Sequence, residues 1–177
     1  MALLDLKYYG DPILRKETHS VKEFDSELER FAQDMIETMT TNIGVGLAAP
    51  QVDDLRSLII IDVSSEEDEE EENLEPFILV NPDIIELSGN CVIEEGCLSI
   101  PEVRVEVERP EEIRVIYQDI KGNKKDLKCD GILARVIQHE VDHLRGRLMI
   151  DYLSSVKRDL LKSKLQKISR GEIPAGV

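Results

Sequence analysis

The chain has 177 residues, of which 41% are hydrophobic and 33% charged, so it can bury one folded core and is not wholly disordered. Its apolar runs are far shorter than the roughly 20 residues that a membrane helix needs, so we expect no segment to span a bilayer. The net charge of −15 argues against nucleic-acid binding, sequence-specific binding included, because an acidic surface repels phosphates.

The cysteines and the N-terminal residues indicate the compartment. Three cysteines, an odd number in a chain that can fold without crosslinks, indicate reduced thiols rather than a disulfide framework. The first ten residues lack the basic start and long apolar stretch of a secretory signal, and they lack the Arg- and Ser-rich bias of a transit peptide. We therefore expect a cytoplasmic protein.

The first predicted elements lie near the N-terminus. A short turn or helix opens at Asp11–Pro12. Between residues 24 and 39, apolar residues recur every three or four positions, which is the period of an amphipathic helix. Asp25 or Ser26 caps its start, so the helix is predicted over about residues 26–41.

Short runs rich in β-branched residues, several of them alternating with charged residues, predict strands with one buried face. The predicted strands are 57–63, 77–80, 91–94, 103–107, 112–118 and 124–129. Seven consecutive acidic residues at 66–72 predict a solvated, mobile loop over 64–75, because like charges do not pack together.

Two helices follow the last strand. The stretch from Gly131 to about Arg145 is strongly apolar, so we expect it to be central, and a final helix is predicted over 154–169, ending at Gly171. The predicted fold class is therefore α+β. A single domain over residues 1–177 has short, mostly antiparallel strands around the central helix, with a C-terminal helix outside them.

The strongest chemical signal is an H-E-x-x-H pattern on the central helix. His139 and His143 are four residues apart, so one helical face presents both imidazoles to one metal ion. Glu140 beside them is placed to move protons to and from water at the metal. The alternative is a chance pair of histidines, but unpaired imidazoles in an apolar helix would be costly.

A catalytic metal of this kind needs a third protein ligand. The longer zincin pattern is excluded because Met149 stands where its last histidine would be. Glu172 is a possible third ligand, but its side chain would have to reach back to the metal from beyond a separate helix. Cys97 follows Gly96 in a break between strands, which makes it the better candidate, whereas Cys91 and Cys129 are interpreted as small buried hydrophobic residues.

The segment 44–51, with the sequence GVGLAAPQ, follows a helix and precedes a strand. That order is the reverse of a phosphate-binding glycine loop, so a nucleotide site is disfavoured. Taken alone, the segment is interpreted as a structural turn in which Gln51 supplies an amide donor.

Three segments together resemble the signature motifs of peptide deformylases, in the same order and in a chain of similar length. They are GVGLAAPQ at 44–51, EGCLS at 95–99 and QHEVDH at 138–143. The resemblance extends from the residues around Asp11 to the C-terminal helix. Two departures are the acidic loop and Val45, where many relatives carry isoleucine.

The resemblance implies a metal site made of Cys97, His139 and His143, usually with Fe(II) in this family and with zinc, nickel or cobalt as substitutes. It implies that Glu140 is the general base and acid. The reaction implied is removal of the formyl group from N-formyl-methionyl nascent peptides, with release of formate.

Further roles are also implied by the resemblance. The Gln51 side-chain amide and the Leu98 backbone N–H would hold the oxygen of the tetrahedral intermediate. The Gly46 backbone, and Glu95 through an ion pair with Arg109, would support the site.

A methionine pocket is a further hypothesis. Ile132 and Val136 share the helical face of the two histidines, so they are candidates to line such a pocket together with Val45 and Gly46. The alternative, that Ile132 and Val136 are ordinary core residues, stays open.

The C-terminal helix departs from the acidic character of the chain. From 154 to 170 it has six basic residues and only Asp159 as an acidic one. In similar deformylases the C-terminal extension helps dock on the ribosome, so docking is one interpretation; a solvated helix packed on the body is the other.

Two rival functions remain at this point. An H-E-x-x-H metallopeptidase would cleave between residues and normally lacks a cysteine ligand. A non-catalytic protein with a structural metal usually closes the site with four protein ligands, and no fourth ligand stands out in the sequence.

Overall fold

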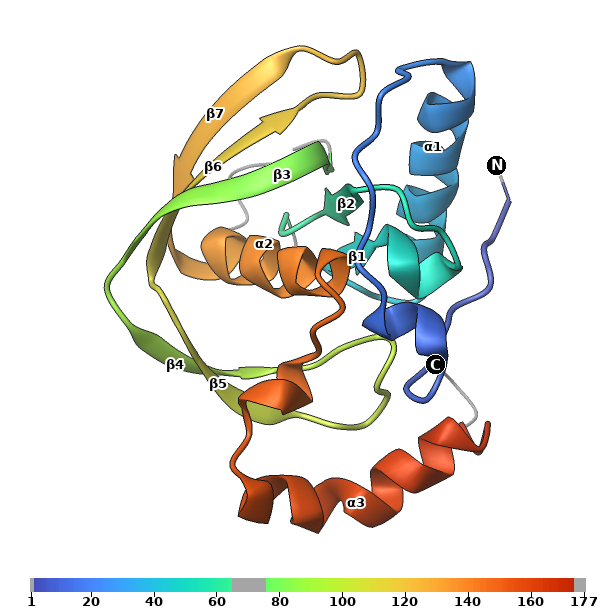
Figure 1. Ribbon diagram of the computed structural model, residues 1–177, viewed down its shortest axis with the longest axis vertical. Coiled ribbons are helices and arrows are strands. Elements are labelled where there is room, and N and C mark those ends of the chain that lie inside the picture. Colours follow the sequence, from blue (N-terminus) through green and yellow to red (C-terminus); the bar gives the residue numbers. More distant parts are fainter. Residues whose placement is uncertain (1, 65–75, 174–177) are drawn as a thin grey trace.

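The computed structural model describes residues 2–64 and 76–173, which form an α+β fold built around helix α2 (Gly131–Leu144). In Figure 1, α2 lies in the middle, strands β3, β6 and β7 curve over one side of it, and β4 and β5 lie on the other. The acidic segment 66–72, predicted to be a mobile loop, lies outside the described residues.

The larger sheet has five strands in the order β1-β2-β3-β6-β7, and every neighbouring pair is antiparallel. The strands are β1 (Gly46–Ala48), β2 (Leu58–Ile61), β3 (Phe77–Ser88), β6 (Glu112–Gln118) and β7 (Lys124–Cys129). Antiparallel pairing was predicted and is confirmed. Strand β1 was not predicted, because a run of three residues that starts with glycine is too short to show an alternating pattern.

A separate two-stranded ribbon pairs β4 (Cys91–Glu95) with β5 (Val105–Arg109) in antiparallel register. In β5, buried and exposed residues alternate, so the valines face inward. The strand predicted at 103–107 starts two residues later, since Glu102 adopts a positive φ of 56° and the chain turns there. Val103 is buried before the strand begins.

Strand β3 corrects the prediction of a strand at 77–80, because it continues to Ser88. The pairing with β6 shifts register after Val80, where Asn81 has a positive φ of 52° and Pro82 follows. Asn and Pro are typical of turns, so the sequence indicated an end where the strand has only a bulge.

Three α-helices match their predicted positions. Helix α1 (Ser26–Thr41) is capped by the Asp25 carboxylate, which accepts from two backbone N–H groups. Helix α2 follows Asp130, and α3 (Ser155–Ser169) is capped by Ser154. Short 3-10 turns are η1 (Pro12–Arg15), η2 (Ala49–Val52) and η3 (Met149–Tyr152). No helix in the described ranges is long and apolar enough to cross a membrane.

The core explains why α2 is central. All residues of α2 from Ala134 to Leu144 are buried, and the helix contacts β1, β2 and β6. Its apolar side packs with Ile59, Leu79 and Val115 of the large sheet. A second cluster joins α1 to the other side of β1 and β2, and a third joins α3 to η1, η3 and β5. Polar side chains on α2 are therefore held away from bulk water.

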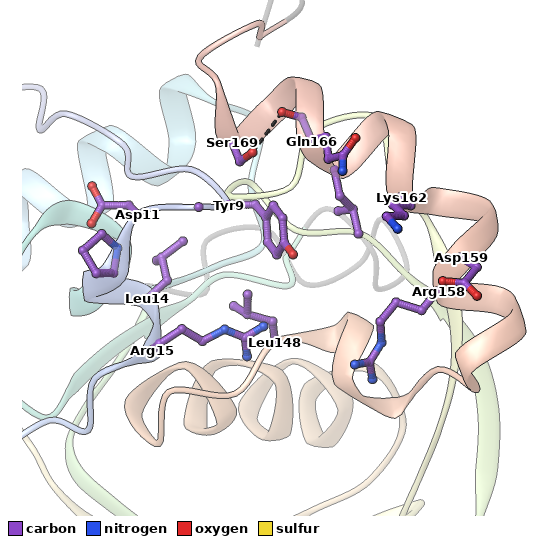
Figure 2. A pocket seen from close by; sticks show the side chains of 13 residues that line it. Tyr9, Asp11, Leu14, Arg15, Leu148, Arg158, Asp159, Lys162, Gln166 and Ser169 are labelled. Carbon is purple, nitrogen blue, oxygen red and sulfur yellow. Dashed lines mark hydrogen bonds between the residues drawn. The ribbon is translucent and has the colours of Figure 1, made fainter.

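A groove of about 510 Å³ separates α3 from η1. Figure 2 shows Arg158 and Lys162 of α3 beside this groove, facing Tyr9, Leu14 and Arg15 across it. The groove is lined by residues other than the histidines of α2, so it is distinct from the site described below.

Asn81 gives a test of the bulge in β3. Its Oδ1 accepts from the N–H of Val21, and its Nδ2 donates to the Val21 carbonyl and to Gln118 Oε1, at 2.8–2.9 Å. Because Asn81→Ala loses these bonds and keeps the positive φ, we expect it to lower the free energy of unfolding by about 2–3 kcal/mol. Asn81→Gly relieves the backbone, so its loss should be about 1 kcal/mol smaller in urea titrations. Equal losses for the two variants would contradict the role of the positive φ.

Candidate metal centre

His139 and His143 lie one turn apart on the buried helix α2, as the sequence predicted. Their ring centroids are 5.1 Å apart and the ring planes are inclined by 67°. Both residues are less than a tenth exposed. The two imidazoles therefore share one face of the helix and are shielded from bulk solvent.

Cys97 joins the two histidines from a different part of the fold. It lies in the turn that follows β4, where the N–H of Ile100 donates to its carbonyl at 3.0 Å. The Cys97 Sγ is 3.4 Å from His143 Nε2, and the ligand atoms of all three residues lie within 4.8 Å of one another. Within residues 2–64 and 76–173, this is the one cluster of three or more potential metal ligands.

The donor set fits a divalent ion. One thiolate and two imidazoles leave a fourth position of a tetrahedral site open, which is the arrangement of catalytic rather than structural sites. Next to the cluster, Glu140 Oε2 is buried and has no hydrogen-bond partner among the described residues. A buried carboxylate oxygen without a partner is costly, so it indicates a ligand or water that the site is built to hold.

Glu140 is held in a strongly desolvated position. Burial raises the pKa of its carboxyl to about 7, and the neighbouring Glu95 adds to that shift while His139 opposes it. A carboxyl with a pKa near neutrality both accepts and returns a proton. Glu140 is therefore suited to proton transfer, whereas the pKa of the nearby Glu95 is held at about 2.

The two histidines have opposite shifts. Burial disfavours the charged form of His139, but hydrogen bonds with Cys97 and Glu95 raise its pKa well above the ordinary value. Burial and the nearby His139 lower the pKa of His143 well below the ordinary value. Close packing of ionisable groups in a low-dielectric interior produces both shifts.

Gln51 and Leu98 lie beside Cys97. The Gln51 Oε1 accepts from the N–H of Ala48 at 2.8 Å, which fixes the orientation of the amide. Its Nε2 then donates to Ser99 Oγ at 3.1 Å and lies 3.7 Å from Cys97 Sγ. The N–H of Leu98 donates to no group within the described part of the chain.

A buried ion-pair network supports His139. Its Nδ1 is 3.0 Å from Glu95 Oε2, and Arg109 donates to both oxygens of Glu95 at 2.6 and 3.0 Å. The expected ion pair between Glu95 and Arg109 is confirmed. Arg109 also donates to Asp142 at 2.7 Å, and the Tyr152 hydroxyl donates to the same carboxylate at 2.8 Å.

The sequence analysis missed Asp142, Tyr152 and Arg135, which belong to this network. One available signal was Arg135, a charged residue one turn before His139 in the predicted central helix. Charged residues are rarely buried unless they are paired, so Arg135 indicated a partner without identifying it.

The four residues proposed for a methionine pocket lie together. Val45, Ile132 and Val136 pack in one apolar cluster with the large sheet. A side chain on Gly46 would collide with Glu140 Oε1 and would lie 2.8 Å from Val136 Cγ1. Glycine at this position therefore lets β1 approach both the carboxylate and the apolar face of α2.

Comparisons with known proteins agree with one another. A family model described as polypeptide deformylase matches residues 3–159. A peptide deformylase structure from Legionella pneumophila is 37% identical, with a TM-score of 0.86, and covers 97% of this chain and 98% of that one. The peptide deformylase from Thermotoga maritima is 41% identical, with a TM-score of 0.80, over 87% of this chain and 99% of that one. A third peptide deformylase, from Synechococcus elongatus, is 40% identical, with a TM-score of 0.81, over 96% of this chain and 87% of that one. The resemblance predicted from the three motifs is confirmed.

Two glycine variants test the close approach of β1 to α2. Because Gly46→Ala forces a methyl group against Glu140 and Val136, we expect it to lower the free energy of unfolding by about 1–3 kcal/mol. Gly96→Ala is the matched control, since its methyl group would meet only Arg104 Cγ at 4.0 Å. Urea unfolding of the metal-free proteins gives the comparison. If the two variants lose the same free energy of unfolding, the close approach of β1 to α2 does not restrict the residue at position 46.

Proposed function

The chain belongs to the polypeptide deformylase family, and from that membership we propose which of its residues carry out the reaction. It is a metal-dependent hydrolase that removes the formyl group from the N-formyl-methionine of newly made polypeptides and releases formate. Family membership excludes the metallopeptidase and the non-catalytic metal protein as its function. The observation that carries the residue assignment is the convergence of Cys97, His139 and His143 beside the unpartnered oxygen of Glu140.

Cys97, His139 and His143 hold the metal in this proposal. A bound divalent ion polarises the formyl carbonyl and makes water more acidic. We propose Fe(II) as the native ion because the resemblance to peptide deformylases implies it. Zinc, nickel or cobalt are proposed as substitutes, since one thiolate and two imidazoles suit each of these metals. The three free thiols support the cytoplasm as the place of work.

Glu140 moves the proton. Its carboxylate takes a proton from the attacking water, whose oxygen bonds to the formyl carbon. When the bond from that carbon to the methionine nitrogen breaks, Glu140 returns the proton to the nitrogen, so formate and a free amine leave. Its pKa of about 7, raised by burial, supports both transfers near neutral pH.

Gln51 and Leu98 stabilise the developing oxyanion. Negative charge grows on the formyl oxygen during attack, and preorganised N–H donors lower the energy of that state. The Gln51 amide is already oriented with its Nε2 toward Cys97, and the Leu98 N–H is free of other acceptors within residues 2–64 and 76–173. The Leu98 N–H therefore needs no rearrangement before it acts, whereas the Gln51 amide exchanges its bond to Ser99 Oγ for one to the oxyanion.

Val45, Gly46, Ile132 and Val136 form the binding site for the methionine side chain. Val45, Ile132 and Val136 supply an apolar surface next to the histidine face of α2. Strand β1 is at the edge of the five-stranded sheet, so one side of its backbone has no strand partner within the described sheet. An extended peptide can lie along that edge with its first side chain on the apolar surface.

We also propose that the basic residues of the C-terminal helix dock the enzyme on the ribosome. Of the six basic residues at 154–170, Arg158 and Lys162 line the groove in Figure 2, and Lys157 and Lys164 lie 3.4 Å from Glu106 and Glu102. Lys167 and Arg170 are exposed and pair with no carboxylate among the described residues. We assign them to contact with the ribosomal phosphates.

Glu140→Gln and Cys97→Ala separate the catalytic role from the metal-binding role. We expect Glu140→Gln to lower kcat for formate release from formyl-Met-Ala-Ser by about 10²–10⁴-fold with metal retained, because only the proton carrier is lost. Cys97→Ala should lose metal, and activity with it. Formate assays and metal analysis under anaerobic conditions provide both readouts.

His19→Ala is the control for these assays, because His19 is exposed and is the one histidine outside the cluster. It should match the wild type in formate release and metal content. If fully metallated wild type releases no formate, the function is wrong, and cleavage inside the peptide would show a peptidase instead.

The docking surface has its own test. The double variant Lys167→Glu/Arg170→Glu should reduce co-sedimentation with ribosomes by tenfold or more at low salt, because each reversal replaces attraction to phosphate by repulsion (about 1 kcal/mol per charge). Lys121→Glu/Lys124→Glu, at the turn between β6 and β7, makes the same charge change far from α3 and should have little effect. Equal binding by the two double variants would refute the assignment to α3.

A further inference from the structure

Glu95 is the most heavily bonded carboxylate near the proposed metal ligands. It is 6% exposed at the end of β4, and it has contacts with three side chains. Its Oε2 faces His139 Nδ1, and Arg109 binds both of its oxygens. The remaining contact is from Arg135, whose Nη1 donates to Oε1 at 3.0 Å.

Arg135 connects three elements through one guanidinium. It lies on α2 one turn before His139 and is 4% exposed. In addition to Glu95, its Nη1 donates to the Val107 carbonyl at 2.9 Å and its Nη2 donates to the Cys91 carbonyl at 2.7 Å. Arg135 therefore ties the helix to both strands of the β4–β5 ribbon.

The ribbon is attached to α2 on both sides of His139. Arg109 of β5 reaches Asp142, which lies beyond His139 on the helix, and Arg135 reaches back to the ribbon from before His139. With both attachments, the Glu95 carboxylate is held opposite the turn of α2 that carries His139.

Charge balance supports the same role. Glu95 and Asp142 are two buried carboxylates, and Arg109 and Arg135 are two buried guanidinium groups. Removal of one partner from such a cluster leaves an uncompensated buried charge. Groups that hydrogen-bond a metal-ligating histidine fix its tautomer and its ring orientation.

We propose that Arg135 is a positioning residue of the metal centre, which holds Glu95 against Nδ1 of His139 and so directs Nε2 of His139 to the metal. The proposal rests on the assignment of His139 as a ligand. Arg135 does not touch the metal or the substrate. Its effect on the reaction passes through Glu95 and His139.

Cobalt binding tests the proposal without substrate. We expect Arg135→Met to weaken Co(II) affinity by about tenfold or more, measured by chelator competition under anaerobic conditions, and to change the visible absorption of the Co(II) protein. Arg135→Lys should have an intermediate effect, because an ammonium group keeps the charge but cannot reach all three acceptors in one plane.

Leu28→Ala separates positioning from loss of stability. Leu28 is buried in the core on α1 and contributes nothing to the ion-pair network, so this variant should lose unfolding free energy without losing Co(II) affinity. The proposal is overturned if Arg135→Met binds Co(II) within twofold of the wild type, or if Leu28→Ala weakens binding as much. If Arg135→Met does not fold, Arg135→Lys and Arg135→Gln decide the question by the same criterion. A chain that binds Co(II) as described but releases no formate would refute the function and leave the inference standing.

Discussion

The structure depends on the burial of a helix that carries charged side chains and the two proposed histidine ligands into the core. Helix α2 has Arg135, His139, Glu140, Asp142 and His143 within three turns, and all of them are buried. Unpaired charges in such an environment cost several kcal/mol each. The surrounding elements therefore have to supply partners, and their positions follow from that need. The β4–β5 ribbon brings Glu95 and Arg109 to the helix, and the turn after β4 brings Cys97. The 3-10 turn η3 brings Tyr152.

The same constraint explains why one carboxylate is left without a partner. Glu95 and Asp142 accept hydrogen bonds from arginine or tyrosine donors, whereas Glu140 Oε2 receives none from the described residues. Glycine at position 46 lets β1 pass close to that carboxylate without closing the space beside it. Burial alone would raise the pKa of Glu95, but hydrogen bonds with His139 and Arg109 hold it at about 2, whereas burial raises the pKa of Glu140 to about 7.

Local patterns in the sequence predicted much of this arrangement. Helical periodicity placed α1 and α3 within a residue of their ends, and the spacing of His139 and His143 predicted a shared helical face. The length of β3 could not be predicted, because Asn81 and Pro82 signal a turn while tertiary pairing with β6 carries the strand onward. The contacts of Arg135 could not be predicted either, since Glu95 and Cys91 are about 40 residues away in the chain and only the fold brings them together.

The central claim is that one cysteine and two histidines bind the metal together. X-ray absorption spectroscopy of the zinc-loaded protein tests it most directly, because sulfur and nitrogen scatter differently. The account predicts one sulfur at about 2.3 Å and two imidazole nitrogens at about 2.0–2.1 Å, with the remaining scatterer a light atom. A zinc shell without sulfur, or with a single imidazole, would contradict it.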